Sequence, residues 1–128
     1  MCATVTALRP NERVRLDAEP IAAMYRNLGA STAEQVVSRA LSELALTLAG
    51  LADQVQGHDL CDLSRGLRRL QRMADHLGMI SLGSVATEAR LCLDGNDDTA
   101  FSAVWARLIR VAEASLAPDQ EMLDRSLH

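Results

Sequence analysis

The sequence DLCDLSRGLRRLQRMADHLGMISLG, residues 59–83, predicts an amphipathic helix followed by a tight turn. At about 100° per residue, the apolar side chains of this stretch fall within one narrow stripe. The stripe consists of Leu63, Leu67, Leu70, Ala74 and Leu77. A helix with one apolar stripe buries that stripe against other elements, so we expect this helix to lie at the centre of a helical core.

The opposite face of the same helix carries basic side chains. Steps of three or four residues separate them, which makes them neighbours along one surface line. This basic line consists of Arg65, Arg69, Arg72 and His76, with Arg68 beside it and no acidic residue between Arg65 and Arg72. The common interpretation is a solvated helix face. Because unpaired like charges on one helix cost stability, an external anion or an acidic partner surface is the alternative.

His76 is the one member of the basic line with nucleophilic chemistry. A neutral imidazole nitrogen can accept a phosphoryl group, and guanidinium groups bind phosphates and carboxylates. An exposed histidine near a helix C-terminus can equally serve the helix alone, because an imidazolium ion complements the helix dipole. Both interpretations of His76 stay open.

Composition restricts the class of protein. The chain of 128 residues fits one domain, and 48% hydrophobic against 23% charged residues argue against intrinsic disorder. Aromatic residues make up only 2%, which favours helices over sheets. A net charge of −4 argues against nucleic-acid binding by the whole domain. With no signal peptide, no membrane-spanning run and three widely spaced cysteines, we expect a cytoplasmic protein without membrane contact.

Motifs for metal or cofactor binding are weak. His58 and Cys61 form a lone pair of possible ligands, whereas zinc takes three or four. The sequence also has no phosphate-binding glycine loop. We therefore predict no metal site and no cofactor.

Four further helices are predicted around the central one, at about residues 20–28, 32–56, 82–94 and 98–116. The second begins with a capping box, Ser31 to Glu34, and its apolar residues recur in a heptad seam. The seam consists of Val37, Leu41, Leu44, Leu48, Leu51 and Val55. Ser81-Leu82-Gly83-Ser84 predicts the turn before the helix at 82–94.

Together these elements predict an all-α fold, an antiparallel up-down four-helix bundle with a short extra N-terminal helix. Residues 1–18 are predicted to be a flexible N-terminal arm, 19–117 the bundle and 118–128 a C-terminal tail.

This order of elements resembles a histidine-containing phosphotransfer (HPt) domain over about residues 20–117. The most specific part is MADHLGMISLG, residues 73–83. HPt domains carry a phospho-accepting histidine, a lysine three residues later, a small residue after it and a Leu-Gly turn further on. Leu82-Gly83 matches that turn, and counting back from it puts Met73 at the acceptor position and His76 at the lysine position.

The resemblance allows two interpretations. Either His76 is an acceptor displaced by one helical turn, with Arg72 in place of the lysine charge, or the domain has lost the acceptor and keeps only the docking surface. The missing lysine weakens the first interpretation. Gly78 and Ser81 fit both, because small residues near the acceptor leave room for a response regulator.

The function implied by the resemblance is two-component signalling. We expect the chain to dock a receiver domain or a histidine kinase, with or without phosphoryl transfer through His76, and to have no independent enzymatic activity. Any magnesium would belong to the receiver. The expected partner-binding residues are Arg65, Arg69, Arg72, Met73, Gly78 and Ser81. The alternative is a non-catalytic interaction or dimerisation module, because the heptad seam suits a monomeric bundle and a homodimer equally well.

Overall fold

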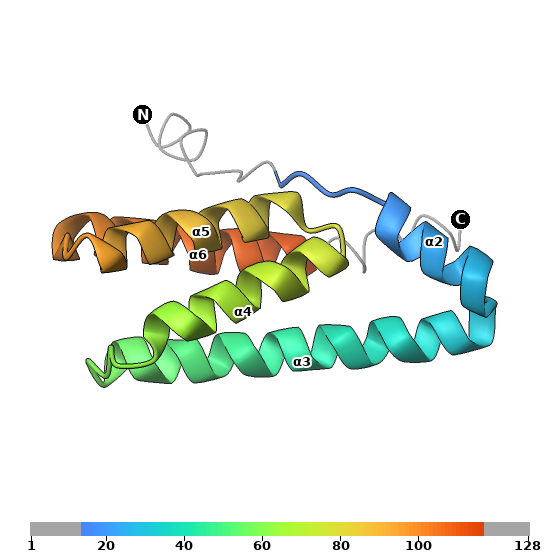
Figure 1. Ribbon diagram of the computed structural model, residues 1–128, viewed down its shortest axis with the longest axis horizontal. Helices are drawn as coiled ribbons and strands as arrows, with labels where there is room; N and C mark the ends of the chain where they lie inside the picture. The colour runs from blue at the N-terminus through green and yellow to red at the C-terminus, as the bar shows by residue number, and fades with distance from the viewer. Residues whose placement is uncertain (1–13, 117–128) are drawn as a thin grey trace, which may run out of the picture.

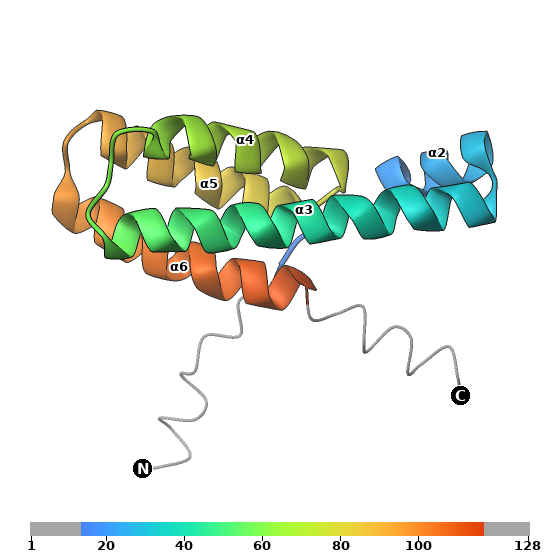
Figure 2. The same ribbon diagram turned by 90° about the horizontal axis from the view of Figure 1, so that it is seen from below.

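A computed structural model describes residues 14–116, and the expected all-α class is confirmed for this range (Figure 1). It contains five helices there: α2 (Glu19–Leu28), α3 (Ala30–Gln56), α4 (Leu63–His76), α5 (Ile80–Asp94) and α6 (Asp98–Leu116). From α3 onward, each helix runs back along the one before it (Figures 1 and 2). Within the same range, no helix combines the length and the apolar content that a bilayer span requires.

The stripe that the sequence predicted on α4 lies at the centre of the core. All five of its members, Leu63, Leu67, Leu70, Ala74 and Leu77, are buried. They belong to one hydrophobic cluster that also takes side chains from α3, α5 and α6. The helical period of 3.6 residues therefore predicted correctly which side of α4 is buried and which side carries the exposed basic line.

Five of the six members of the heptad seam of α3 face the same core. Leu44, Leu48 and Leu51 are buried, and Leu41 and Val55 pack against the cluster at its edge, whereas Val37 is half-buried outside the cluster. With 27 residues against the 14 of α4, α3 also extends past the end of α4, and its N-terminal part is covered by α2 (Figure 1). The seam therefore holds the chain's own core together.

The predicted capping box at Ser31 to Glu34 is wrong. Gly29 adopts a left-handed conformation, φ +81°, and its N–H donates to the carbonyl oxygen of Tyr25, which ends α2. The next helix starts at once, because the Ala33 N–H donates to the Gly29 carbonyl oxygen at 3.0 Å. Ser31 therefore lies inside the first turn of α3, too late to cap it.

The predicted turn at Ser81-Leu82-Gly83-Ser84 is also wrong. The chain turns at Leu77–Met79, where Gly78 takes φ +74°, and α5 begins at Ile80. Gly83 lies inside α5 and is buried against α4, where an added Cβ would overlap the Asp75 carboxylate. Gly83 therefore allows close packing of α5 against α4. The count that put Met73 at the acceptor position started from Leu82-Gly83 as a turn, and these residues are helical.

Residues 14–17, the end of the predicted arm, are held against the α4–α5 turn. The Asp17 N–H donates to the Gly78 carbonyl oxygen at 2.7 Å. The Arg15 N–H donates to Ser81 Oγ at 2.7 Å, and the Ser81 N–H donates back to the Arg15 carbonyl oxygen at 3.3 Å. Residues 1–13 of the arm and the predicted tail lie outside the described residues.

Candidate functional site

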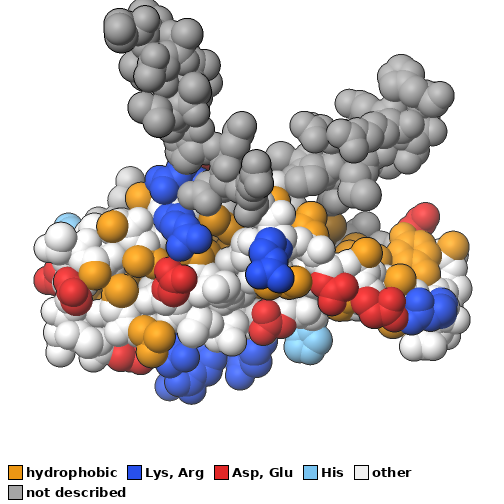
Figure 3. All heavy atoms as spheres, turned by 90° about the horizontal axis from the view of Figure 1, so that it is seen from above, with side chains coloured by type: hydrophobic (Ala, Val, Ile, Leu, Met, Phe, Trp, Pro, Cys, Tyr) orange, Lys and Arg blue, Asp and Glu red, His pale blue; other side chains and the backbone are white. Residues whose placement is uncertain are grey.

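The basic line occupies the outward face of α4. Arg65, Arg69, Arg72 and His76 are all exposed, as is Arg68 beside them. They are exposed because the buried stripe uses the opposite side of the helix. On the face drawn in Figure 3, basic side chains lie in several separate places, with acidic side chains between them.

The charges of the basic line are not compensated within the described part of the chain. Ion pairs there involve the guanidinium groups of Arg26, Arg90 and Arg107. None of the four α4 arginines has a carboxylate within 4.0 Å in residues 14–116. Guanidinium groups bind carboxylates and phosphates in a two-pronged geometry, so this face is suited to an anionic partner.

His76 ends α4 with its ring held by the helix backbone. Its Nδ1 lies 2.7 Å from the Arg72 carbonyl oxygen. A carbonyl oxygen only accepts hydrogen bonds, so Nδ1 carries the proton of this bond. In the neutral ring, Nε2 then holds the lone pair, and the side chain is exposed. The hydrogen bond to the backbone therefore leaves Nε2 as the ring nitrogen with a free lone pair when His76 is neutral.

Met73 flanks the basic line on the side of α3. Its side chain is half-buried and packs against the edge of the core. The Thr47 hydroxyl donates to Met73 Sδ at 3.5 Å across the α3–α4 interface. A thioether has no phosphoryl chemistry of its own, so Met73 can only contribute contact area to a partner.

Gly78 and Ser81 lie beneath residues 15–17 of the same chain. Gly78 is buried, and a Cβ there would overlap the Asp17 carbonyl oxygen. The Ser81 hydroxyl is the acceptor for the Arg15 N–H. The small size of both residues accommodates this intramolecular contact, which no local pattern in the sequence predicted.

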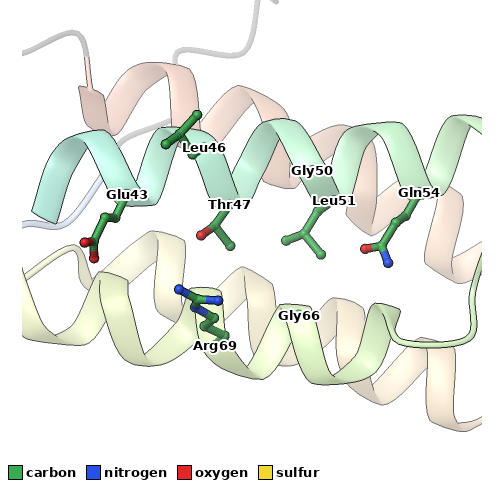
Figure 4. A pocket seen from close by; sticks show the side chains of 8 residues that line it. All are labelled: Glu43, Leu46, Thr47, Gly50, Leu51, Gln54, Gly66 and Arg69. Carbon is green, nitrogen blue, oxygen red and sulfur yellow. The ribbon is translucent and has the colours of Figure 1, made fainter.

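A shallow groove of about 620 Å³ runs between α3 and α4 next to the basic line (Figure 4). Gly50 and Gly66 leave room along it, and an added Cβ at Gly66 would clash with the Leu51 side chain. In Figure 4 the Arg69 side chain reaches from α4 toward α3 near Glu43 and Thr47. Arg69 thus belongs to the basic line and borders the groove.

The described residues hold no cluster of three or more histidine, cysteine or acidic side chains placed to bind a metal ion. His58 and Cys61 are both exposed, in the loop before α4.

No model of a known protein family matches the chain, and neither a curated protein nor a solved structure matches it. The site is assigned from its own residues, and the HPt resemblance stays a prediction from the sequence.

Proposed function

We propose that this chain is an HPt-like protein of cytoplasmic two-component signalling, in which α3–α6 form an antiparallel four-helix bundle. The outward face of α4 docks a receiver domain or a histidine kinase. The resemblance implies a receiver domain with an acidic phosphorylation pocket as the partner. An arginine-lined helix complements such a pocket in charge. Unpaired surface arginines favour fast, salt-sensitive encounters of the kind that signalling requires.

The observation that carries the proposal is a line of arginines, unpaired among the described residues, that ends in an exposed histidine with a defined nucleophilic nitrogen. In phosphoryl transfer, Nε2 of His76 attacks the phosphorus of a receiver's aspartyl phosphate. The N–P bond forms while the P–O bond to aspartate breaks, and the carboxylate leaves. Arg72 and Arg69 would steady the charge of the transferred group.

Docking without transfer is the second form of the same proposal. Met73 beside the basic line has a half-buried thioether that cannot take a phosphoryl group. In this form the basic line recognises the partner, and His76 is one of its contacts.

Phosphoryl transfer is tested by incubating the purified chain with labelled, phosphorylated receiver domains from the same genome. Wild type and His76→Ala are compared, with His58→Ala as the matched control because His58 is also exposed but lies away from the basic line. Acid-labile label on wild type and on His58→Ala, but not on His76→Ala, supports transfer through His76. Binding of a receiver or kinase without label supports the docking form.

Absence of both label and binding with every receiver and kinase tested would contradict the proposed function. It would favour the other candidate, a helical interaction module with no phosphorelay chemistry. A specific observation supports that candidate as well: the side of α3 that faces solvent carries exposed apolar side chains.

A further inference from the structure

α3 carries a second seam, on its solvent side, in addition to the seam that faces the core. Its members, Val36, Arg39, Glu43 and Leu46, are separated by steps of three, four and three residues. These steps are those of the a and d positions of a coiled coil. All four side chains are exposed, and Glu43 and Leu46 also border the groove that α3 shares with Arg69 of α4.

The two apolar members of the outer seam are exposed to different degrees. Leu46 is 73% exposed and Val36 is 41% exposed. Figure 2 shows α3 in front of the other helices along its length, with no helix laid over it. In Figure 4 the Leu46 side chain points away from α4. Burial of an exposed apolar side chain by a partner is favourable, because it removes apolar surface from water.

The two charged members lie between the apolar ones. Neither Arg39 nor Glu43 forms an ion pair with any residue that the structure describes. Reading along α3, the order is apolar, basic, acidic, apolar. Read in the opposite direction, the order is apolar, acidic, basic, apolar. An antiparallel second copy therefore puts apolar residues opposite apolar ones and a basic residue opposite an acidic one.

A second copy of α3 laid antiparallel across the first satisfies all four positions at once. With the two-fold axis at the level of Leu41, Val36 faces Leu46 of the second copy, and Arg39 faces Glu43 of the second copy. Symmetry makes each contact twice. A parallel arrangement would put arginine on arginine and glutamate on glutamate, which is repulsive.

The surface around Val36 is shaped to receive such a contact. A hollow of about 350 Å³ is lined by Gln35, Val36, Arg39, Ala40 and Glu43. In the antiparallel arrangement the second copy's Leu46 falls at this level of α3. The insertion of an apolar side chain between four residues of a facing helix is the unit of coiled-coil packing.

We infer that the outer seam of α3 is the interface of an antiparallel homodimer. Val36 and Leu46 bury apolar surface in the interface. Arg39 and Glu43 fix the antiparallel direction and the register of the two helices, as single polar positions do in coiled coils. The inference does not rest on phosphoryl chemistry, because it uses a different helix from the basic line.

Analytical ultracentrifugation of the full chain over a range of concentrations tests the dimer. We expect a reversible monomer–dimer equilibrium whose dissociation constant rises about tenfold or more in Leu46→Glu. Leu91→Glu is the matched control, because Leu91 is 59% exposed on α5 and lies outside the seam. A wild-type chain that stays monomeric, or a dimer that Leu46→Glu leaves intact, would overturn the inference.

A charge exchange separates this interface from any other. Arg39→Glu and Glu43→Arg should each weaken the dimer about tenfold, because each puts like charges opposite one another. The double variant, with both exchanges, restores opposite charges and should recover most of the wild-type affinity. A double variant no tighter than the single variants would show that these residues do not face each other.

Discussion

At the scale of single residues, the turn after His76 depends on Gly78. Its φ of +74° is a conformation that L side chains rarely adopt, and its buried surface lies against the Asp17 carbonyl oxygen. The positive φ strains any residue that has a Cβ, and the Asp17 carbonyl oxygen occupies the space that a Cβ would need. The turn, the extended residues 14–17 and the start of α5 are therefore linked through one glycine.

We predict that Gly78→Ala lowers the free energy of unfolding by about 2 kcal/mol or more, from conformational strain plus the clash with Asp17. The measurement is urea denaturation followed by circular dichroism, at low protein concentration.

Gly50→Ala is the control for this variant. Gly50 lies inside α3 with open space around the added Cβ, so alanine there should raise stability by about 0.5–1 kcal/mol. If both alanines changed stability in the same direction, the structural role given to Gly78 would be wrong.

Sequence periodicity was enough to predict the exposure of individual α4 residues. Arg65, Arg69, Arg72 and His76 lie on the solvent side as predicted, because helical geometry alone decides it. The environment of Gly78 and Ser81 could not be predicted, since it is made by Arg15 and Asp17 from a distant part of the chain. Hydrogen bonds between distant segments leave no local pattern.

At the scale of elements, α4 is the helix on which both the core and the candidate site depend. Gly66 lets α3 approach it on one side, and Gly83 lets α5 approach it on the other. Its buried side chains fill the space between those neighbours. The position of the basic line is therefore fixed by packing.

Leu70→Ala should destabilise the fold by about 3 kcal/mol, because Leu70 is fully buried and its loss leaves a cavity between helices. The readout is the midpoint of urea denaturation. Leu91→Ala makes the same chemical change at an exposed position and should stay within about 0.5 kcal/mol of wild type. Equal effects of the two variants would contradict the placement of the core.

The errors in element boundaries occur at two places and have different physical origins. Gly83 was interpreted as part of a turn, whereas the structure uses it for contact between α4 and α5. Glycine suits both uses, and only the neighbouring helix decides between them. Ser31 to Glu34 has the composition of a cap, but α3 starts directly after Gly29, so Ser31 already lies inside its first turn.

At the scale of the whole molecule, α3 and α4 present two neighbouring surfaces, because Glu43 and Leu46 of the outer seam and Arg69 of the basic line border the same groove. The basic line on α4 is a cationic surface suited to an acidic partner, and the outer seam on α3 complements itself. A dimer through α3 would display two basic lines. The all-α class could be predicted from composition and from the periodicity of the apolar residues. The partners could not, because they depend on exposed side chains, which the pattern of buried apolar residues does not determine.

The proposed docking through α4 is tested most directly by the affinity of a receiver domain for Arg69→Ala/Arg72→Ala. Arg107→Ala/Arg110→Ala on α6 is the control, because it removes the same charge from another helix. We expect the α4 variant to bind about tenfold more weakly, with a smaller dependence on salt, and the α6 variant to bind like wild type. Equal affinities for wild type and the α4 variant would contradict the claim that α4 is the docking surface.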